Sequence, residues 1–373
     1  MTLKISDSFD AGAIEVLRAE SPQAIELNLR ADSHADIRQW FYFRLQGAHG
    51  QACSMRFLNA GQAAFPAGWD NYQALASYDR EHWFRVPTQY DGQVLSVACT
   101  PQQDSMYFAY FEPYSWERHL RLLGRAQASP LVRLEDLGST VDGRDLNLLQ
   151  IGDPGAANKV WVIARQHPGE TMAEWFAEGL IEALLDQANP LARRLLQYAV
   201  FYIVPNMNPD GAVRGNLRTN AAGANLNREW MEPSLEKSPE VYLVRRRIHE
   251  TGCNFFLDVH GDEALPHVFV AGSEMLEDFS AQQAAEQQRF IEGFQRASPD
   301  FQTQYGYASG KYREDMLKLA SKYIGHTFRC PSLTLEMPFK DNAGLPDAQA
   351  GWSGARSARL GAAVLQPILA LFS

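Results

Sequence analysis

The chain carries a strand-like run that leads into a polar turn, Lys159-Val160-Trp161-Val162-Ile163-Ala164 and then His167-Pro168-Gly169-Glu170. The run is short, apolar and rich in β-branched residues, and the Pro-Gly pair after it marks a tight turn. We therefore expect a buried strand that ends just before His167, followed by a helix over residues 171–187. A turn of this kind can aim the imidazole of His167 and the carboxylate of Glu170 at one point.

A second strand-like run, Phe255-Phe256-Leu257-Asp258-Val259-His260, ends in another histidine. Strands of an α/β sheet present the residues at their carboxyl ends on one edge, where such sheets bind ligands. Two imidazoles and one carboxylate with an open fourth position are the ligands of catalytic zinc, whereas structural zinc sites are closed and rich in Cys. A lone His-x-x-Glu recurs by chance. Together with His260, however, it predicts one zinc ion per chain, bound by His167, Glu170 and His260.

The composition is that of an ordinary globular protein. The 373 residues are 46% hydrophobic and 21% charged, which is enough chain for about two domains. There is no apolar run long enough to cross a bilayer and no signal-peptide pattern at the amino terminus, so we expect a cytoplasmic protein without membrane association. A formal charge of −10 argues against general nucleic-acid binding. The four cysteines are widely spaced, and we expect buried free thiols.

Two domains of different class are predicted. Residues 1–115 contain apolar and aromatic runs separated by turn residues, which predicts an antiparallel β-sandwich; the clearest runs are 24–29, 40–45, 93–99 and 106–111. Ser115 is the expected N-cap of a helix over 116–125. In residues 116–373 an Asp142-Gly143 hairpin is followed by strands that alternate with helices. This pattern predicts an α/β domain with a mixed, largely parallel sheet flanked by helices; the expected helices are 171–187, 239–251, 282–297 and 353–371, and the expected strands are 159–164, 199–204, 254–260, 268–271 and 332–335.

Two further segments carry candidate chemistry. Residues 205–230 form a long segment rich in Gly and Asn that bears three arginines, and we expect a functional loop without regular structure. Arginine can clamp a carboxylate or stabilise an oxyanion. Further on, Glu336 lies at the end of an apolar strand. A charged side chain buried there is costly unless it has a partner or a function. Beside a metal site, Glu336 could accept a proton from water and return it to a leaving amine.

These segments resemble, in order, the M14 zinc carboxypeptidases, and most closely the cytosolic carboxypeptidase subfamily with its bacterial members. The matching motifs are His167-Pro-Gly-Glu170, Asn208-Pro-Asp-Gly211, Gly215-Asn-Leu-Arg218, Asn225-Leu-Asn-Arg-Glu-Trp230, Asp258-Val-His-Gly261 and Thr334-Leu-Glu336. The resemblance extends over nearly the whole chain, because the subfamily also has an amino-terminal β-sandwich that ends in a similar aromatic segment.

The resemblance implies a zinc-dependent metallocarboxypeptidase that removes one residue from the carboxy-terminal tails of peptides or proteins. Glu336 would be the general base and then the general acid, and Arg218 would stabilise the oxyanion. Asn227 and Arg228 would hold the terminal carboxylate of the substrate. Asp258 lies on the same strand face as His260 and could orient an imidazole.

The chain departs from the subfamily at two positions. Asn225 stands where the subfamily often has Asp, and Leu333 stands where many members have Tyr. The substrate-capping tyrosine of the family therefore has several candidates, which are Tyr305, Tyr307, Tyr312 and Tyr323. Lys311 and Arg313 are candidate substrate-binding residues that would favour a carboxy-terminal Glu or Asp.

Two other functions remain open from the sequence. A deacylase of N-acyl amino acids would share the metal site, and a catalytically silent peptide-binding module would share the fold. The amino-terminal β-sandwich and the Asn-Arg-x-Trp segment, residues 227–230, favour the peptidase over the deacylase. The complete set of Glu336 and three ligands argues against the silent module.

Overall fold

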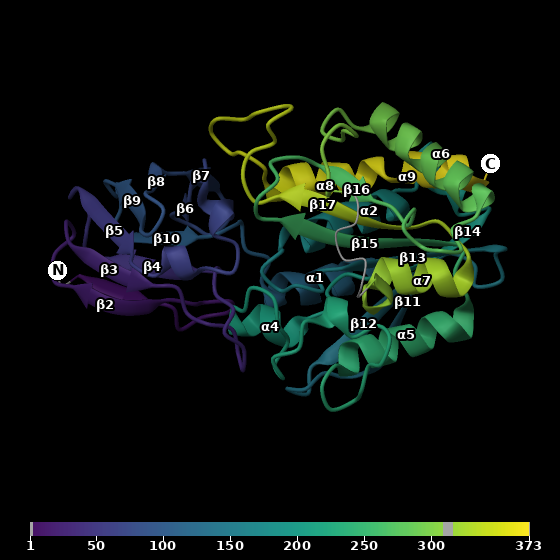
Figure 1. Cartoon of the computed structure of the whole chain (residues 1–373), viewed down its shortest axis with the longest axis horizontal. Helices are drawn as coiled ribbons and strands as arrows, with labels where there is room; N and C mark the ends of the chain where they lie inside the picture. Colours follow the sequence, from purple (N-terminus) through teal and green to yellow (C-terminus); the bar gives the residue numbers. More distant parts are fainter. Residues whose placement is uncertain (1–2, 309–315, 373) are drawn as a thin grey trace.

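The computed structural model describes residues 3–308 and 316–372. A β-rich amino-terminal part lies beside a larger α/β part, and the polypeptide passes from one to the other before helix α1, Trp116–Ala126 (Figure 1). The side chain of Ser115 accepts a hydrogen bond from the backbone N–H of Arg118 at 3.1 Å, as expected of an N-cap. The division into residues 1–115 and 116–373 agrees with this arrangement but stays a prediction.

The amino-terminal part consists of two sheets, so the expected β-sandwich class is confirmed. One sheet has the order β1 (Lys4–Ser6), β4 (Tyr42–Gln46), β10 (Ser105–Ala109), β6 (Leu75–Ser77), β7 (Trp83–Arg85). The other has the order β2 (Glu15–Ala19), β3 (Ile25–Asn28), β5 (Cys53–Phe57), β9 (Leu95–Cys99), β8 (Thr88–Tyr90). The strand pairs are antiparallel except β3 with β5. Their facing side chains, among them Phe41, Phe43 and Phe57, form a buried aromatic core.

The second part is built on one mixed sheet. Its order is β11 (Val132–Ser139), β12 (Asp145–Ile151), β14 (Ala199–Val204), β13 (Asn158–Ala164), β15 (Phe255–Asp262), β17 (Ser332–Pro338), β16 (Phe269–Ala271). The central strands β14, β13, β15 and β17 run parallel, and the outer strands join them antiparallel. The Asp142-Gly143 pair lies in the turn between β11 and β12, as predicted.

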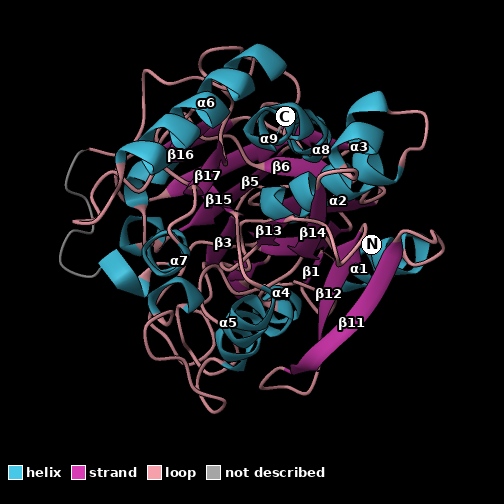
Figure 2. Cartoon of the chain, turned by 90° about the vertical axis from the view of Figure 1, so that its right-hand side faces the viewer, coloured by secondary structure: helices cyan, strands magenta, loops and turns pink. Residues whose placement is uncertain are grey.

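Helices cover both faces of this sheet (Figure 2). Along β13, Val160 and Val162 point into one core with residues of α2 (Met172–Leu185), α6 (Ala281–Ala297), α8 (Gly354–Ala363) and α9 (Leu365–Phe372). Trp161 and Ile163 point into a second core with α5 (Pro239–Thr251) and α7 (Ala320–Phe328). A strand buried on both faces is apolar along its buried length, which is the pattern that residues 160–164 show.

Two sequence predictions need correction, and two helices were not predicted. Residues 353–371 are two helices rather than one, because Pro367 has no N–H to donate to the carbonyl of Ala363. Residues 205–230 are not free of regular structure, since they contain α4 (Pro209–Arg214) and a short 3-10 helix, Leu226–Arg228. Helix α7 was not expected at all, and neither was the short α3 (Pro190–Leu195).

Two further expectations can be compared with the structure. Cys53, Cys253 and Cys330 are buried thiols, and Cys99 is partly exposed. Among the helices of the described residues, none is both long and apolar enough to cross a bilayer.

Candidate active site

The expected metal ligands meet at the carboxyl edge of the sheet. His167 and Glu170 lie in the turn between β13 and α2, and His260 lies near the end of β15. Strands β13 and β15 pair in parallel with Ala164 opposite Val259, so both strands end at the same edge of the sheet. The side chain of Arg165 stabilises this turn, because its Nε donates a hydrogen bond to the carbonyl oxygen of Pro168 at 2.9 Å.

The donor atoms of this triad converge. Glu170 places one carboxylate oxygen 2.6 Å from His167 Nδ1 and the other 2.7 Å from His260 Nδ1. The two Nδ1 atoms are 3.2 Å apart. All three side chains are buried, and one donor atom from each lies within 4.8 Å of the others.

The far nitrogen of each imidazole faces an oxygen that can accept a hydrogen bond. His260 Nε2 lies 2.9 Å from Asp258 Oδ2, and His167 Nε2 lies 3.1 Å from Asn225 Oδ1. These acceptors hold the ring proton on Nε2, so the lone pair of each Nδ1 points at the carboxylate. A cation between these atoms can bind both Nδ1 lone pairs and the carboxylate of Glu170 at once. The donor set of His167, Glu170 and His260 therefore fits a zinc ion.

The pKa shifts within the triad have clear causes. Burial, together with the positive charge of the nearby Arg218, lowers the pKa of His167 to about 3. Burial would also lower the pKa of His260, but Asp258 and Glu170 hold it well above the usual value. Burial opposes ionisation of Glu170, yet the two imidazoles keep its pKa below the ordinary range. The site thus keeps its carboxylate ionised, as a metal ligand must be.

Glu336 lies next to the triad. It pairs with His260 in the register of β17 and β15. Its Oε1 accepts a hydrogen bond from the hydroxyl of Tyr307 at 2.8 Å, and its Oε2 is buried without a hydrogen-bond partner among the described residues. Burial raises the pKa of Glu336 to about 8. A divalent cation at the triad would favour the ionised carboxylate.

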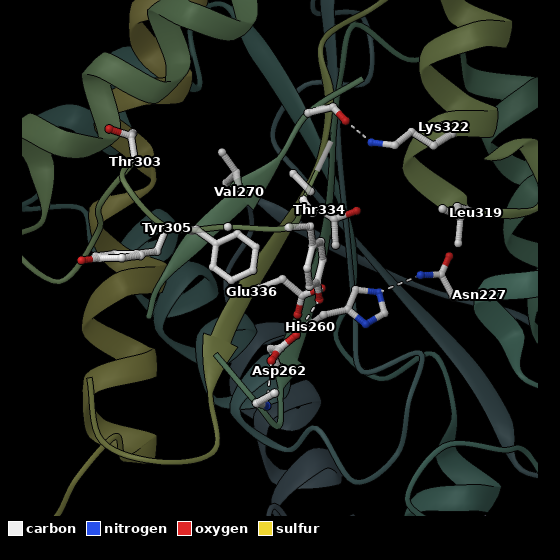
Figure 3. A pocket seen from close by; sticks show the side chains of 18 of the residues that line it. Asn227, His260, Asp262, Val270, Thr303, Tyr305, Leu319, Lys322, Thr334 and Glu336 are labelled. Carbon is white, nitrogen blue, oxygen red and sulfur yellow. Dashed lines mark hydrogen bonds between the residues drawn. The ribbon is translucent and has the colours of Figure 1, made fainter. Parts of the chain in front are cut away.

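A cavity of about 860 Å³ joins these groups. Its described lining includes the predicted metal ligands and, of the described residues, the predicted catalytic and carboxylate-binding ones: His167, Glu170, Arg218, Asn227, Arg228, His260 and Glu336. Asn227 is held by the backbone N–H of Ala320, which donates to its Oδ1 at 2.8 Å, and its Nδ2 lies 3.3 Å from His260 Nε2 (Figure 3). The sequence-predicted clamp and the predicted metal ligands therefore share one cavity.

The remaining predicted residues separate into several groups. Lys311, Arg313 and Tyr312 lie outside the described residues. Tyr305 is 50% exposed and stacks on His267, and Tyr323 bonds to His249 on α5. Among the candidate tyrosines that the structure describes, Tyr307 is hydrogen-bonded to Glu336, and its hydroxyl also lies 2.9 Å from Asp262 Oδ2.

Sequence reasoning missed other residues that shape the site. Lys322, on the unexpected helix α7, lines the cavity with Thr334 of β17 (Figure 3). Gln166 donates to Asp258 Oδ2 at 2.8 Å, and its own Oε1 accepts from the indole of Trp230 at 2.9 Å. Gln166 could have been noticed because it directly precedes His167. Lys322 had no such signal, since it lies in a stretch for which we expected no helix.

Comparisons with known proteins agree with this geometry. The family model described as zinc carboxypeptidase matches residues 119–348, and the one described as cytosolic carboxypeptidase N-terminal domain matches residues 5–111. A metallo-carboxypeptidase from Burkholderia cenocepacia has 60% identity and a TM-score of 0.98 over 99% of both chains. One from Pseudomonas aeruginosa, in complex with (2-guanidinoethylmercapto)succinic acid, has 46% identity and a TM-score of 0.95 over 98% of both chains.

Eukaryotic relatives are similar over part of their length. Cytosolic carboxypeptidase 6 from Mus musculus is 32% identical over 69% of this chain and 50% of its own length. The chain thus spans about half the length of that relative. The zinc carboxypeptidase model covers more than half of the chain, and its match coincides with the sheet that carries the triad and Glu336. The protein therefore belongs to the M14 family of zinc carboxypeptidases and is a metallopeptidase with an amino-terminal domain of the cytosolic carboxypeptidase type.

Proposed function

We propose that the protein is a zinc-dependent carboxypeptidase that removes a single residue from the carboxy-terminal tail of a peptide or protein. One observation carries the proposal: a single cavity is lined by a triad fit for zinc, a buried carboxylate beside it and two arginines. Only the last residue of a peptide has a free main-chain carboxylate. A group that binds this carboxylate in the same cavity as the hydrolytic centre therefore selects the end of the chain. The Pseudomonas relative binds a succinic acid derivative, a ligand with two carboxyl groups, and this supports carboxylate recognition.

Each site residue has a proposed role in this reaction. His167, Glu170 and His260 would hold the zinc. When bound, zinc supplies Lewis-acid chemistry and lowers the pKa of a nearby water. Glu336 takes a proton from the attacking water through Oε2, which has no hydrogen-bond partner among the described residues, and later gives it to the leaving amine.

The remaining residues bind and orient the substrate. Arg218 donates to the oxygen of the scissile carbonyl as negative charge develops there. Asn227 and Arg228 hold the terminal carboxylate, for which the guanidinium fork is suited.

We further propose a preference for acidic carboxy-terminal residues, in which the ammonium group of Lys322 binds the acidic side chain of the last substrate residue. Lys322 lines the cavity, is 9% exposed and donates to the carbonyl of Gly272. Burial lowers its pKa to about 8, whereas the charge of Glu274 opposes this and favours the ammonium form. A buried cation in a substrate cavity gains most from an anionic ligand. The proposed preference thus rests on Lys322 rather than on Lys311 or Arg313.

Lys322→Met should remove this preference. The variant keeps the length of the side chain but loses its charge, so kcat/KM for peptides ending in Glu should fall by about 10- to 100-fold, the value of a charge-assisted hydrogen bond. Peptides ending in Gln provide the control, because Gln matches Glu in shape and lacks the charge. Wild-type protein should prefer Glu over Gln, and the variant should treat them alike. Equal cleavage of both peptides by the wild type would contradict the proposed preference.

A panel of peptides that end in Glu, Asp, Lys, Leu or Phe tests the activity itself. We expect release of one free amino acid per peptide, and we expect a chelator to stop it. N-acyl amino acids belong in the same panel, because faster turnover of these compounds would favour the deacylase. Peptide binding without any release by zinc-loaded protein would favour the silent binding module.

The setting of the reaction is part of the proposal. We propose a cytoplasmic location, supported by the free cysteines and by the name of the cytosolic carboxypeptidase relatives. Peptide or protein tails are the proposed partners. The division of the chain at residues 115 and 116 is the proposed domain boundary.

A further inference from the structure

The segment that carries Arg218 is held by the amino-terminal domain. The carboxylate of Asp32 accepts hydrogen bonds from three consecutive backbone N–H groups, those of Leu217, Arg218 and Thr219, at 2.7, 2.8 and 2.9 Å. The hydroxyl of Thr219 adds a fourth at 3.2 Å. Asp32 is 7% exposed. Burial raises its pKa, and these donors oppose that rise. One buried carboxylate thus fixes the backbone on both sides of Arg218.

Neighbouring contacts extend this attachment. Ser33 donates to Asn216 Oδ1 through its backbone N–H at 3.1 Å and its hydroxyl at 3.2 Å. Gly215 and Gly223 flank the segment with φ of 68° and 80°, and a Cβ at either would lie 2.6 Å from a backbone oxygen of the amino-terminal domain. Glycine lets the two backbones approach this closely. The amino-terminal domain therefore contacts residues 215–219 and Gly223 of this segment.

The side chain of Arg218 also meets the amino-terminal domain. Its guanidinium carbon lies 5.1 Å from the centre of the Phe65 ring, within the range of a cation–π contact. The side chain of Gln39 makes two hydrogen bonds with the backbone of Phe65. Its Oε1 accepts from the N–H of Phe65 at 2.9 Å, and its Nε2 donates to the carbonyl of Phe65 at 3.1 Å. Phe65 and Arg218 both line the cavity.

The same segment touches the metal-binding turn. Gly169 donates its N–H to the carbonyl of Leu217 at 2.8 Å, and a Cβ on Gly169 would lie 3.0 Å from Leu217. Asp32 is separated from Leu217 by 185 positions in the sequence. A continuous set of contacts thus runs from the amino-terminal domain through the Arg218 segment to the turn of His167 and Glu170.

We propose that Asp32 is a positioning residue for Arg218, and that Phe65 aids it, so that the amino-terminal domain completes the oxyanion-binding part of the active site. The proposal rests on the proposed role of Arg218. Oxyanion stabilisation depends on donors fixed before the charge develops, and a loop segment needs outside support to reach that precision. Asp32 supplies the support to the backbone of Arg218, and the Phe65 ring supplies it to the guanidinium.

Asp32→Asn tests this proposal with little change of shape. Asparagine has one side-chain oxygen in place of two. Its NH2 group would face a backbone N–H of this segment, so at least one of the hydrogen bonds that Asp32 accepts would be lost. We expect kcat to fall about tenfold or more, with KM within about twofold, because the contact acts on the transition state. Affinity for a phosphonate peptide, a mimic of the tetrahedral transition state, should fall by the same factor as kcat/KM. Affinity for the product amino acid should not change.

Asp36→Asn is the matched control. Asp36 lies four residues away and is 86% exposed in its side chain, where it pairs with Arg38. The same chemical change there should leave kcat, KM and phosphonate affinity at wild-type values. A loss equal to that of Asp32→Asn would show that any carboxylate of this loop matters, and it would overturn the assignment to Asp32.

Combination with Arg218→Ala separates positioning from general stability. We expect Arg218→Ala alone to lower kcat by about 10²- to 10³-fold. Adding Asp32→Asn to it should change kcat less than twofold, because Asp32 acts through a side chain that is gone. A tenfold further loss in the Arg218→Ala background would overturn the proposal, as would wild-type kcat in Asp32→Asn. Wild-type kcat in Arg218→Ala would refute the proposed role of Arg218 itself and the proposal with it.

Phe65→Leu provides an independent test if Asp32→Asn does not fold. Leucine keeps an apolar side chain but removes the ring that faces the guanidinium. We expect kcat to fall about two- to fivefold, the range of a cation–π contact near the surface. This loss should vanish in the Arg218→Ala background, and its persistence there would overturn the role of Phe65.

Discussion

Replacing Glu336 by glutamine should lower kcat by about 10²- to 10⁴-fold, the range of a general acid–base residue, while the protein stays folded and loaded with zinc. The amide matches the carboxylate in shape, and its oxygen can still accept the hydrogen bond that Tyr307 donates to Oε1. It cannot accept the proton of the attacking water. Rates on the best peptide of the panel and zinc content per chain are the two measurements.

Glu240→Gln is a matched control for this experiment. Glu240 is a buried carboxylate on α5, and it is not among the described residues that line the cavity. Burial raises its pKa to about 7, so the site already accepts a partly neutral group, and the amide oxygen of Gln can still accept the hydrogen bond that Asn220 Nδ2 donates at 3.1 Å. The control should keep wild-type kcat. Near-normal activity in Glu336→Gln would refute the proposed mechanism.

Removal of zinc should abolish hydrolysis and lower the stability of the fold. Without the cation, the buried Glu170 carboxylate loses the charge of zinc, and a proton on His260, whose pKa is raised by Asp258 and Glu170, replaces that charge only in part. If zinc binds only the folded form, a free zinc concentration of about 100 times Kd adds about 2.7 kcal/mol to the free energy of unfolding. Thermal unfolding with a chelator, and then with zinc restored, should show a lower and then a recovered Tm.

His260→Gln should reproduce the effect of zinc removal. Zinc content and activity should both fall, and added zinc should no longer raise Tm. His249→Gln is the matched control, because His249 is exposed on α5 and contacts Tyr323. If the chelated protein turned over peptide at the wild-type rate, the zinc-dependent mechanism would be wrong. If it bound peptide as tightly as before but released nothing, binding would be separable from catalysis.

The central elements of the fold were predictable because their signals are local. The apolar run over residues 159–164 and the Pro-Gly turn define β13 and its end within one short stretch. The same holds for the strand that ends at His260. Errors arose where a local signal was misleading or weak. The residues around Ala363 have a helical pattern that continues past the break, and α7 carries an N-cap without a side-chain hydrogen bond.

The sequence by itself determined the family and the candidate site residues, because the strand ends and motifs that point to His167, Glu170, His260 and Glu336 each lie within one segment. Tertiary structure alone decided which other groups face them. It brought Lys322 and Tyr307 into the cavity and set Asp32 against the backbone of Arg218. The physical reason is that these contacts join segments far apart in the chain. They depend on how the two domains and the outer helices pack, and no periodicity within one segment encodes that packing.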